Sequence, residues 1–213
     1  MNPPLLSNAG LLMRVAVIAY SIMALSGLAF LWLQGELARL YPVCGSRLGA
    51  LGIADDFLGN VGLGMWIGVV TVILSDHTLT RSRAGHFLQE RFSEALEGLR
   101  PGQAVALAVL SGIGEELLFR GLVLIALAHW LSPAAALITS SLVFAAVHVG
   151  PDRRFIWWTV FAFLMGLLLG SLYLATGSLQ APIVLHATVN GLNLVRESWQ
   201  QRLAGFGEGR AGR

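Results

Sequence analysis

Long runs of apolar residues constrain the fold of this chain more than any other feature. A helix that crosses a membrane needs about 20 predominantly apolar residues, and most of these runs approach or exceed that length. Short polar segments separate them, which leaves room for one compact bundle. The sequence therefore predicts an all-α, polytopic transmembrane helix bundle of about six spans. The six runs are residues 15–33, 57–74, 103–130, 134–149, 155–175 and 183–195.

The composition agrees with a membrane protein. Charged residues make up 12% of the chain and hydrophobic residues 55%, whereas an ordinary soluble domain contains about 25% charged residues. The net charge of +2 is too small for a nucleic-acid surface. We therefore expect the lipid bilayer, and no nucleic acid, as a partner. The single cysteine, Cys44, excludes an internal disulfide and a cysteine-based metal site.

Three segments are expected along the chain. Residues 1–102 contain two apolar runs and a polar stretch, residues 76–100, whose apolar side chains recur at helical spacing. This pattern predicts an amphipathic helix at the membrane surface. Residues 103–195 contain the other four runs and form the expected core. Residues 196–213 lack apolar periodicity and are expected to form a polar cytoplasmic tail.

Two further expectations concern the N-terminal runs. The first run follows Arg14 and is longer than the apolar core of a signal peptide, so we expect a retained helix. In the second run, Gly64 and Gly68 are four residues apart. This spacing predicts the close approach of another helix.

The arginines predict the orientation of the bundle, because basic residues accumulate in short cytoplasmic loops. Most of them flank the runs on one side, and only Arg39 and Arg47 fall on the other. Both termini are therefore expected to lie in the cytoplasm. The expected location of the protein is a bacterial cytoplasmic membrane. The arginines on the first side are Arg14, Arg81, Arg83, Arg91, Arg100, Arg153, Arg154, Arg196, Arg202, Arg210 and Arg213.

Charged residues inside the third run require partners or a use. A charge at the centre of a membrane helix costs about 2.5 to 3.5 kcal/mol on insertion scales. Glu116 and Arg120 are four residues apart, so they share a helix face and are expected to form a salt bridge. Glu115 points elsewhere and is left as an unpaired carboxylate. A buried ion pair that only fixes helix register explains Glu116 and Arg120 but not Glu115.

Two later runs contribute further polar side chains. His148 lies near the end of the fourth run, four residues after Phe144. The sixth run carries a polar stripe that would be unfavourable against lipid and is expected to face the bundle. The stripe consists of His186, Asn190, Asn193 and Glu197.

One carboxylate, two histidines and an asparagine on three helices are suited to hydrolysis. A carboxylate accepts a proton from water that attacks a carbonyl, an imidazole orients that water, and His or Asn N–H groups stabilise the oxyanion. Alternatively, Glu115, His148 and His186 bind Zn²⁺, whose bound water becomes the nucleophile. The residues leave both possibilities open, so the expected cofactor is either none or Zn²⁺.

The motifs resemble those of a known family. "EELLFR" at residues 115–120, "FAAVH" at 144–148 and "HATVN" at 186–190 resemble, in order, the EExxxR, FxxxH and HxxxN motifs of the CPBP intramembrane proteases. This family of CAAX proteases and bacteriocin-processing proteins includes the Rce1-type CAAX prenyl endopeptidases. The resemblance covers about residues 103–195 and leaves the first two runs outside it.

The resemblance implies an endopeptidase that cleaves near the C-terminus or membrane boundary of a membrane-associated protein or peptide. It implies that Glu115 and His148 activate water, that His186 and Asn190 line the oxyanion site, and that Glu116 and Arg120 support them. Some relatives act in bacteriocin immunity or protein sorting, so the substrate stays open. The alternatives are a non-catalytic immunity or scaffold protein and a proton-coupled carrier. The sequence has no evident internal repeat, and its absence argues against the carrier.

One expectation concerns depth. Glu115 lies about 18 Å from the cytoplasmic start of its run at 1.5 Å per residue, whereas His148 lies almost at the cytoplasmic end of its own run. For the two to meet, the helix carrying Glu115 must begin deeper or be broken. The glycines at positions 112 and 114 would allow such a break.

Overall fold

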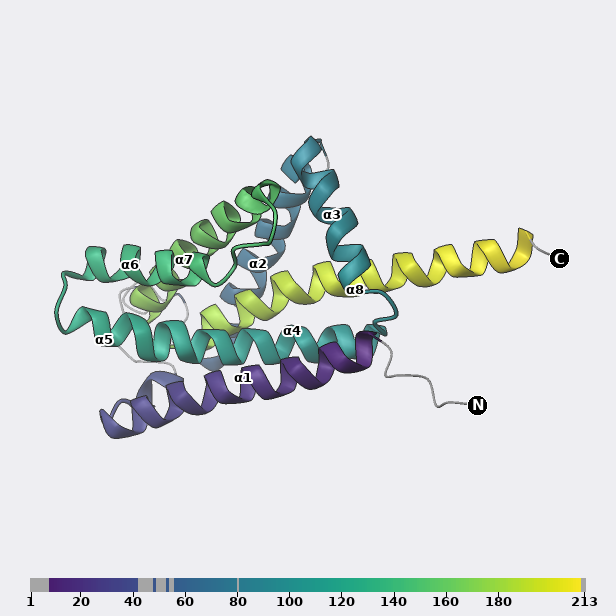
Figure 1. The fold of residues 1–213 in the computed structure, drawn as a ribbon. Coiled ribbons are helices and arrows are strands. Elements are labelled where there is room, and N and C mark those ends of the chain that lie inside the picture. Colours follow the sequence, from purple (N-terminus) through teal and green to yellow (C-terminus); the bar gives the residue numbers. More distant parts are fainter. Residues whose placement is uncertain (1–7, 42–47, 49–52, 54–55, 80, 212–213) are drawn as a thin grey trace.

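The computed structural model describes residues 8–41, 48, 53, 56–79 and 81–211, and all regular elements within this part of the chain are helical (Figure 1). The predicted all-α class is confirmed. Cys44 and Arg47 lie outside the described residues. The α-helices are α1 (Asn8–Leu33), α2 (Phe57–Leu79), α3 (Arg83–Ala95), α4 (Pro101–Glu116), α5 (Ile125–Ala128), α6 (Pro133–Ala146), α7 (Ile156–Thr176) and α8 (Gln180–Ala211), with short 3₁₀ helices η1 (Leu37–Leu40) and η4 (Arg153–Phe155) and a π-helical segment η3 (Leu117–Leu124).

The helix α4, the segment η3 and the helix α5 follow one another without a break, and α1 lies alongside them in the same direction (Figure 1). Helix α8 returns in the opposite direction, so the start of α1 and the end of α8 lie at the same end of the bundle. Local sequence explains where α6 begins and where α7 ends. Ser132 accepts the N–H of Ala135 and Pro133 occupies the first turn of α6, while Gly177 ends α7 in a left-handed conformation (φ 67°).

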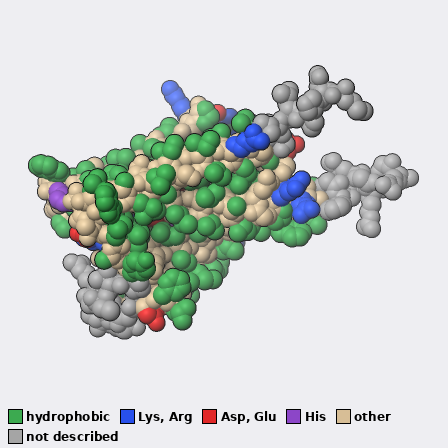
Figure 2. Space-filling view, turned by 90° about the horizontal axis from the view of Figure 1, so that it is seen from below, with side chains coloured by type: hydrophobic (Ala, Val, Ile, Leu, Met, Phe, Trp, Pro, Cys, Tyr) green, Lys and Arg blue, Asp and Glu red, His purple; other side chains and the backbone are tan. Residues whose placement is uncertain are grey.

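The surface of the bundle is apolar. Three helical stretches are long and apolar enough to cross a membrane: Ala9–Leu33, Phe57–His77 and Arg153–Thr176. Large side chains on them point outward, such as Ile18 at 62% exposure and Trp66 at 66%. Figure 2 shows hydrophobic side chains covering most of the face in view. Because such a surface is unfavourable in water but matches lipid, the chain is an integral membrane protein.

Small residues bring α2 close to α8. A Cβ atom added at Gly64 would lie 2.5 Å from the carbonyl oxygen of Ala181, and one at Gly68 would lie 2.8 Å from the Cβ of Thr188. No side chain fits at these distances, so both positions require glycine. The predicted close helix approach at this glycine pair is confirmed.

The predicted amphipathic helix is present as α3, which buries Leu88 and exposes its charged side chains. It is shorter than the expected stretch of residues 76–100, because α2 continues to Leu79 and Ser82 caps the start of α3 by accepting the N–H of Gly85.

The end of α8 corrects a second boundary. The helix was expected to end near residue 195, yet α8 continues to Ala211. Polar residues with good helix propensity extend an existing helix without needing an apolar face, because elongation adds one hydrogen bond for each residue ordered. The chain beyond residue 195 is therefore helical as far as Ala211.

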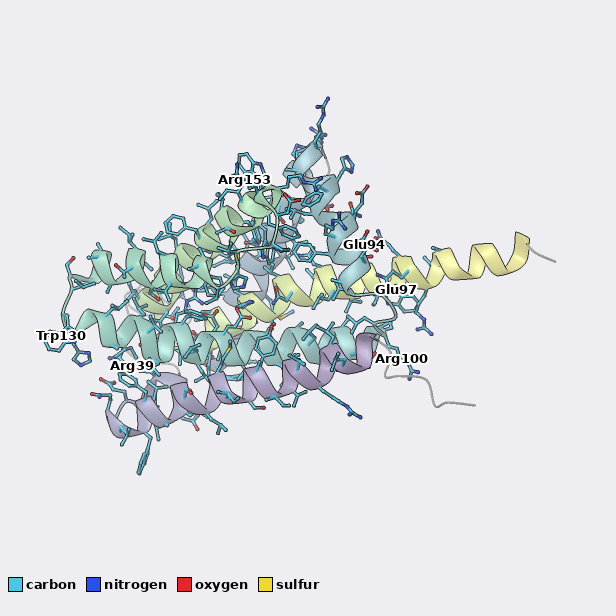
Figure 3. The ribbon with its side chains drawn as sticks, in the orientation of Figure 1. Arg39, Glu94, Glu97, Arg100, Trp130 and Arg153 are labelled. Carbon is cyan, nitrogen blue, oxygen red and sulfur yellow. The ribbon has the colours of Figure 1, made fainter. Side chains whose placement is uncertain are left out.

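Charged side chains gather at the two ends of the bundle. Figure 3 places Glu94, Glu97 and Arg100 toward the end where α1 starts, and Arg39 at the opposite end. Arg39 is paired with Glu36 at 2.9 Å. Arg100 and Arg39 therefore lie at opposite ends of the bundle.

Candidate active site

Three elements carry the motif residues into the middle of the bundle. Glu115 and Glu116 form the last turn of α4, His148 follows the end of α6 by two residues, and His186 lies on the buried face of α8. Helices α4 and α8 pack closely at this level, because a Cβ added at Gly112 would lie 3.0 Å from the backbone nitrogen of Ala187. The pairing of these two helices brings the first and third motifs together.

Glu115 and His148 lie at the same depth because α6 is short. The length of helix between Glu115 and the end of α5 at Ala128 is about 20 Å, at 1.5 Å per residue. Helix α6 contains 14 residues, or about 21 Å, which is less than the hydrocarbon core of about 30 Å. Since one turn joins α5 to α6, both distances are measured from the same level. His148 therefore lies inside the bundle.

A break at Gly112 and Gly114, which the sequence left open beside a deeper start of the helix, is not present. Helix α4 runs through both glycines, and the helix changes to π-helical geometry only after Glu116. Both glycines instead allow close contacts, since a Cβ at Gly114 would lie 2.8 Å from the carbonyl oxygen of Tyr20 in α1. Isolated π-helical turns are rare and are frequently found at functional sites.

The Glu115 carboxylate faces both histidines. Its Oε2 atom lies 3.7 Å from Nε2 of His148 and 3.9 Å from Nε2 of His186. Glu115 is 7% exposed, and Oε2 is buried without a hydrogen-bond partner. A buried oxygen that lacks a partner is unfavourable unless another molecule supplies the missing hydrogen bond. The three atoms thus surround a point that is suited to a polar reactant.

Hydrogen bonds orient both imidazole rings. Nδ1 of His148 lies 2.7 Å from the carbonyl oxygen of Phe144, which can only accept, so Nδ1 carries the hydrogen. Nδ1 of His186 lies 2.8 Å from Oε1 of Glu116 and donates to that carboxylate. In the neutral rings, both Nε2 atoms are then acceptors that point toward Glu115.

Glu116 joins this site to a buried arginine. Its Oε1 also accepts a hydrogen bond from Arg120 at 2.7 Å, and both side chains are almost completely buried. The predicted ion pair is confirmed. Arg120 donates further to the carbonyl oxygen of Gly166 at 3.1 Å and lies 4.7 Å from the centre of the Phe144 ring. Glu116 therefore holds His186 and Arg120 together.

Asn190 lies one turn beyond His186 on α8. Its Nδ2 atom donates to the hydroxyl of Ser111 at 2.8 Å, and that hydroxyl donates to the carbonyl oxygen of Ala108. The side-chain amide has two hydrogens, so one remains for another acceptor. Asn193 and Glu197, in the same predicted stripe, are bonded elsewhere: Asn193 donates to Val189 and Glu197 accepts from Gln201.

The loop after α6 fixes His148 through its backbone. The hydroxyl of Thr159 in α7 donates to the carbonyl oxygen of His148 at 3.2 Å. Further along the loop, Phe155 packs edge to face with Phe87 of α3 at 5.4 Å between ring centres. Hydrogen bonds from Arg154 lower the pKa of Asp152 to about 2, so the acid that caps η4 stays ionised at neutral pH.

Three contacts of the site were not expected from the motifs. They are the contacts of Ser111 with Asn190, of Thr159 with the backbone of His148, and of Tyr20, in the first apolar run, with Gly114. A lone tyrosine or threonine in an apolar run carries no spacing signal, so these contacts depend on helix packing.

The donor set predicted for a metal is suited to zinc in its chemistry but not in its spacing. Ligands of a tetrahedral zinc, at bond lengths of about 2.0 to 2.1 Å, lie about 3.3 Å apart. The distances from Glu115 to His148 and His186 are longer, at 3.7 and 3.9 Å. Among the described residues, no three His, Cys, Asp or Glu side chains are placed to hold a metal ion.

Comparison with known proteins identifies the region around the site. Residues 98–192 match the family model described as type II CAAX prenyl endopeptidase, Rce1-like. The match begins just before α4 and ends in α8, so it includes all three motifs, and it confirms the resemblance seen in the sequence. No curated protein and no solved structure matches the chain.

Proposed function

Because residues 98–192 of this chain belong to the Rce1-like family of CAAX prenyl endopeptidases, we propose that the protein is an intramembrane endopeptidase whose base is Glu115. It hydrolyses a peptide bond near the C-terminus or membrane boundary of a membrane-associated protein or peptide. The observation that supports this proposal is the convergence of Glu115 Oε2 with the Nε2 atoms of His148 and His186 around a buried, polar point.

The reaction begins with water between Glu115 and His148. One O–H donates to Oε2 of Glu115 and the other to Nε2 of His148, which leaves a lone pair on the water oxygen for the substrate carbonyl carbon. Glu115 takes one proton as the new C–O bond forms. When the tetrahedral intermediate collapses, the C–N bond breaks and the proton on Glu115 passes to the leaving nitrogen.

The oxyanion of this intermediate needs hydrogen-bond donors. Asn190 supplies the amide hydrogen that Ser111 does not use. His186 can donate from Nε2 only when its ring carries both protons, and the Glu116 carboxylate at Nδ1 stabilises that form. Glu116 and Arg120 therefore support the oxyanion side of the site, and Glu115 with His148 forms the water side.

Substrate approaches past His148, whose side chain is 21% exposed compared with 7% for His186 and 9% for Glu115. The short α6 leaves His148 at a level that a membrane-bound chain reaches from the lipid side. We place the protein in a bacterial cytoplasmic membrane with both termini in the cytoplasm, as the arginine distribution predicts.

The test compares cells that express the natural protein with cells that express Glu115→Gln, with the C-termini of all membrane proteins mapped by mass spectrometry. The glutamine variant keeps the shape of the side chain but lacks a base, so substrate C-termini should stay uncleaved while the variant accumulates normally. Glu197→Gln on α8 is the matched control and should cleave normally. Identical C-termini in all three cultures would favour the immunity, scaffold or carrier alternatives.

A further inference from the structure

The π-helical segment η3 (Leu117–Leu124) lies directly after the two glutamates of the first motif, and its geometry is not required for hydrolysis by Glu115 and His148 as such. A π-helical turn closes with hydrogen bonds between residues five apart, so it contains one residue more than an α-helical turn. One extra residue rotates the following side chains by about 100° around the helix axis, relative to a continuous α-helix. The segment therefore decides which neighbours Arg120 reaches.

Arg120 binds groups on three other elements from inside this segment. Its guanidinium donates to Oε1 of Glu116 at 2.7 Å and to the carbonyl oxygen of Gly166 in α7 at 3.1 Å, and it lies 4.7 Å from the centre of the Phe144 ring in α6. The same Oε1 atom of Glu116 lies 2.8 Å from Nδ1 of His186. The direction of Arg120 therefore affects the imidazole of His186 through Glu116.

A buried serine of α6 binds the backbone of the π-helical segment. The hydroxyl of Ser140, which is 4% exposed, donates to the carbonyl oxygen of Phe119 at 3.2 Å. This oxygen belongs to the planar peptide group that joins Phe119 to Arg120. The Phe119 ring also packs edge to face with Phe144, one turn after Ser140, at 4.9 Å between ring centres. Ser140 therefore fixes the peptide group from which Arg120 extends.

The neighbouring serine makes a different bond. Ser141 is 1% exposed, and its hydroxyl donates to the carbonyl oxygen of Leu137 in its own helix at 2.7 Å. Its Cβ atom borders Gly166, where an added Cβ would come within 2.9 Å, so the small size of Ser141 lets α7 approach. Alanine would keep that size. The Ser141 bond stays within α6, whereas the Ser140 bond crosses to the π-helical segment.

We propose that Ser140 is a positioning residue of the active site: its hydroxyl fixes the peptide group before Arg120 in the π-helical segment and so directs Arg120 at Glu116, which orients His186. The inference rests on the proposed function, since Ser140 positions the oxyanion side of that site. It adds a residue that lies outside all three motifs.

The first experiment measures the contact itself and does not depend on activity. Amide hydrogen exchange is followed by mass spectrometry in the purified full-length protein, in Ser140→Ala and in Ser141→Ala. Peptides that cover residues 117–124 should exchange about two- to tenfold faster in Ser140→Ala, the factor that corresponds to one net hydrogen bond. They should be unchanged in Ser141→Ala. Equal exchange in all three proteins, or the same acceleration in both variants, would overturn the contact.

The second experiment measures turnover of an internally quenched, farnesylated peptide that ends in a CAAX sequence, well below the melting temperature of each variant. For Ser140→Ala, kcat should fall about tenfold with KM changed less than about twofold, because substrate still binds while the oxyanion side is misdirected. Ser141→Ala is the matched control and should keep the natural kcat. A purely structural role of Ser140 would lower the melting temperature and leave kcat of the folded variant unchanged.

Two failures remain distinct. An active natural protein with an unchanged kcat in Ser140→Ala would refute the positioning role and leave the proposed function intact. Faster exchange of residues 117–124 in Ser140→Ala, without turnover in the natural protein, would refute the proposed function but not the contact.

Discussion

The buried pair of Glu116 and Arg120 allows a quantitative test of the site's architecture. Their side chains are 0% and 2% exposed and are joined at 2.7 Å. In Glu116→Gln the guanidinium keeps the Gly166 carbonyl, the Phe144 ring and at most a neutral amide oxygen at position 116, and it loses its negatively charged partner. In Arg120→Met the carboxylate keeps only His186. Each single variant therefore leaves a buried charge without its counter-ion.

The expected loss is large. Removing one partner of a buried pair destabilises a protein by about 3 to 5 kcal/mol. For a chain of this size, 1 kcal/mol corresponds to about 2 to 4 °C in melting temperature, so each single variant should melt about 6 to 20 °C lower. The double variant has no charge to leave uncompensated, and its loss should be clearly smaller than the sum of the two single losses.

The assay follows intrinsic tryptophan fluorescence on heating of the purified protein, which contains six tryptophans. The matched control is the exposed pair of Arg91 and Glu94, whose side chains are joined at 2.8 Å but are 49% and 66% exposed. Its neutralisation should shift melting by no more than the equivalent of about 1 kcal/mol. Additive losses at positions 116 and 120 would refute the pairing argument. Loss of cleavage in Glu116→Gln at unchanged stability would show that the two glutamates have been assigned the wrong roles.

Three further predictions concern the oxyanion side, the metal and the topology. Asn190→Ala should lower kcat by about 10² to 10³-fold. Ser111→Ala removes only the hydrogen-bond partner of Asn190 and should lower kcat less. Equal rates for Asn190→Ala and the natural protein would exclude Asn190 as an oxyanion donor. Peptidase activity should survive removal of metal from the purified protein, and reversible loss with stoichiometric zinc would require a metal mechanism instead. Cysteines introduced beside Arg83 and after α8 should be protected from an impermeant thiol reagent added to intact cells; labelling of either would reverse the orientation.

Much of the fold follows from local patterns. The apolar runs predict helices, the glycine pair at positions 64 and 68 predicts a close contact, and the spacing of Glu116 and Arg120 predicts their ion pair. Each of these depends on the geometry of one helix, in which residues four apart share a face. The order of the three motifs likewise sufficed to recognise the family before any contact was known.

The depth of each side chain required the tertiary structure. Counting from the ends of apolar runs placed Glu115 and His148 at different levels, because the count assumed that every run crosses the whole membrane. Helix α6 does not cross the whole membrane. The depths of both residues are correctly counted from the turn at residues 129–132, which joins α5 to α6. The end of α8 was missed for a related reason, since a helix need not stop where its apolar residues stop.

The sequence by itself determined which helices form, which charges pair within a helix and which family the catalytic segment resembles, because these depend on neighbours along the chain. Only the tertiary structure decided that Glu116 orients His186, that Ser111 holds Asn190 and that Tyr20 packs against Gly114. Each of these contacts joins two helices that are far apart in sequence. Their geometry is set by how closely the backbones pack, which glycines at several different positions determine together.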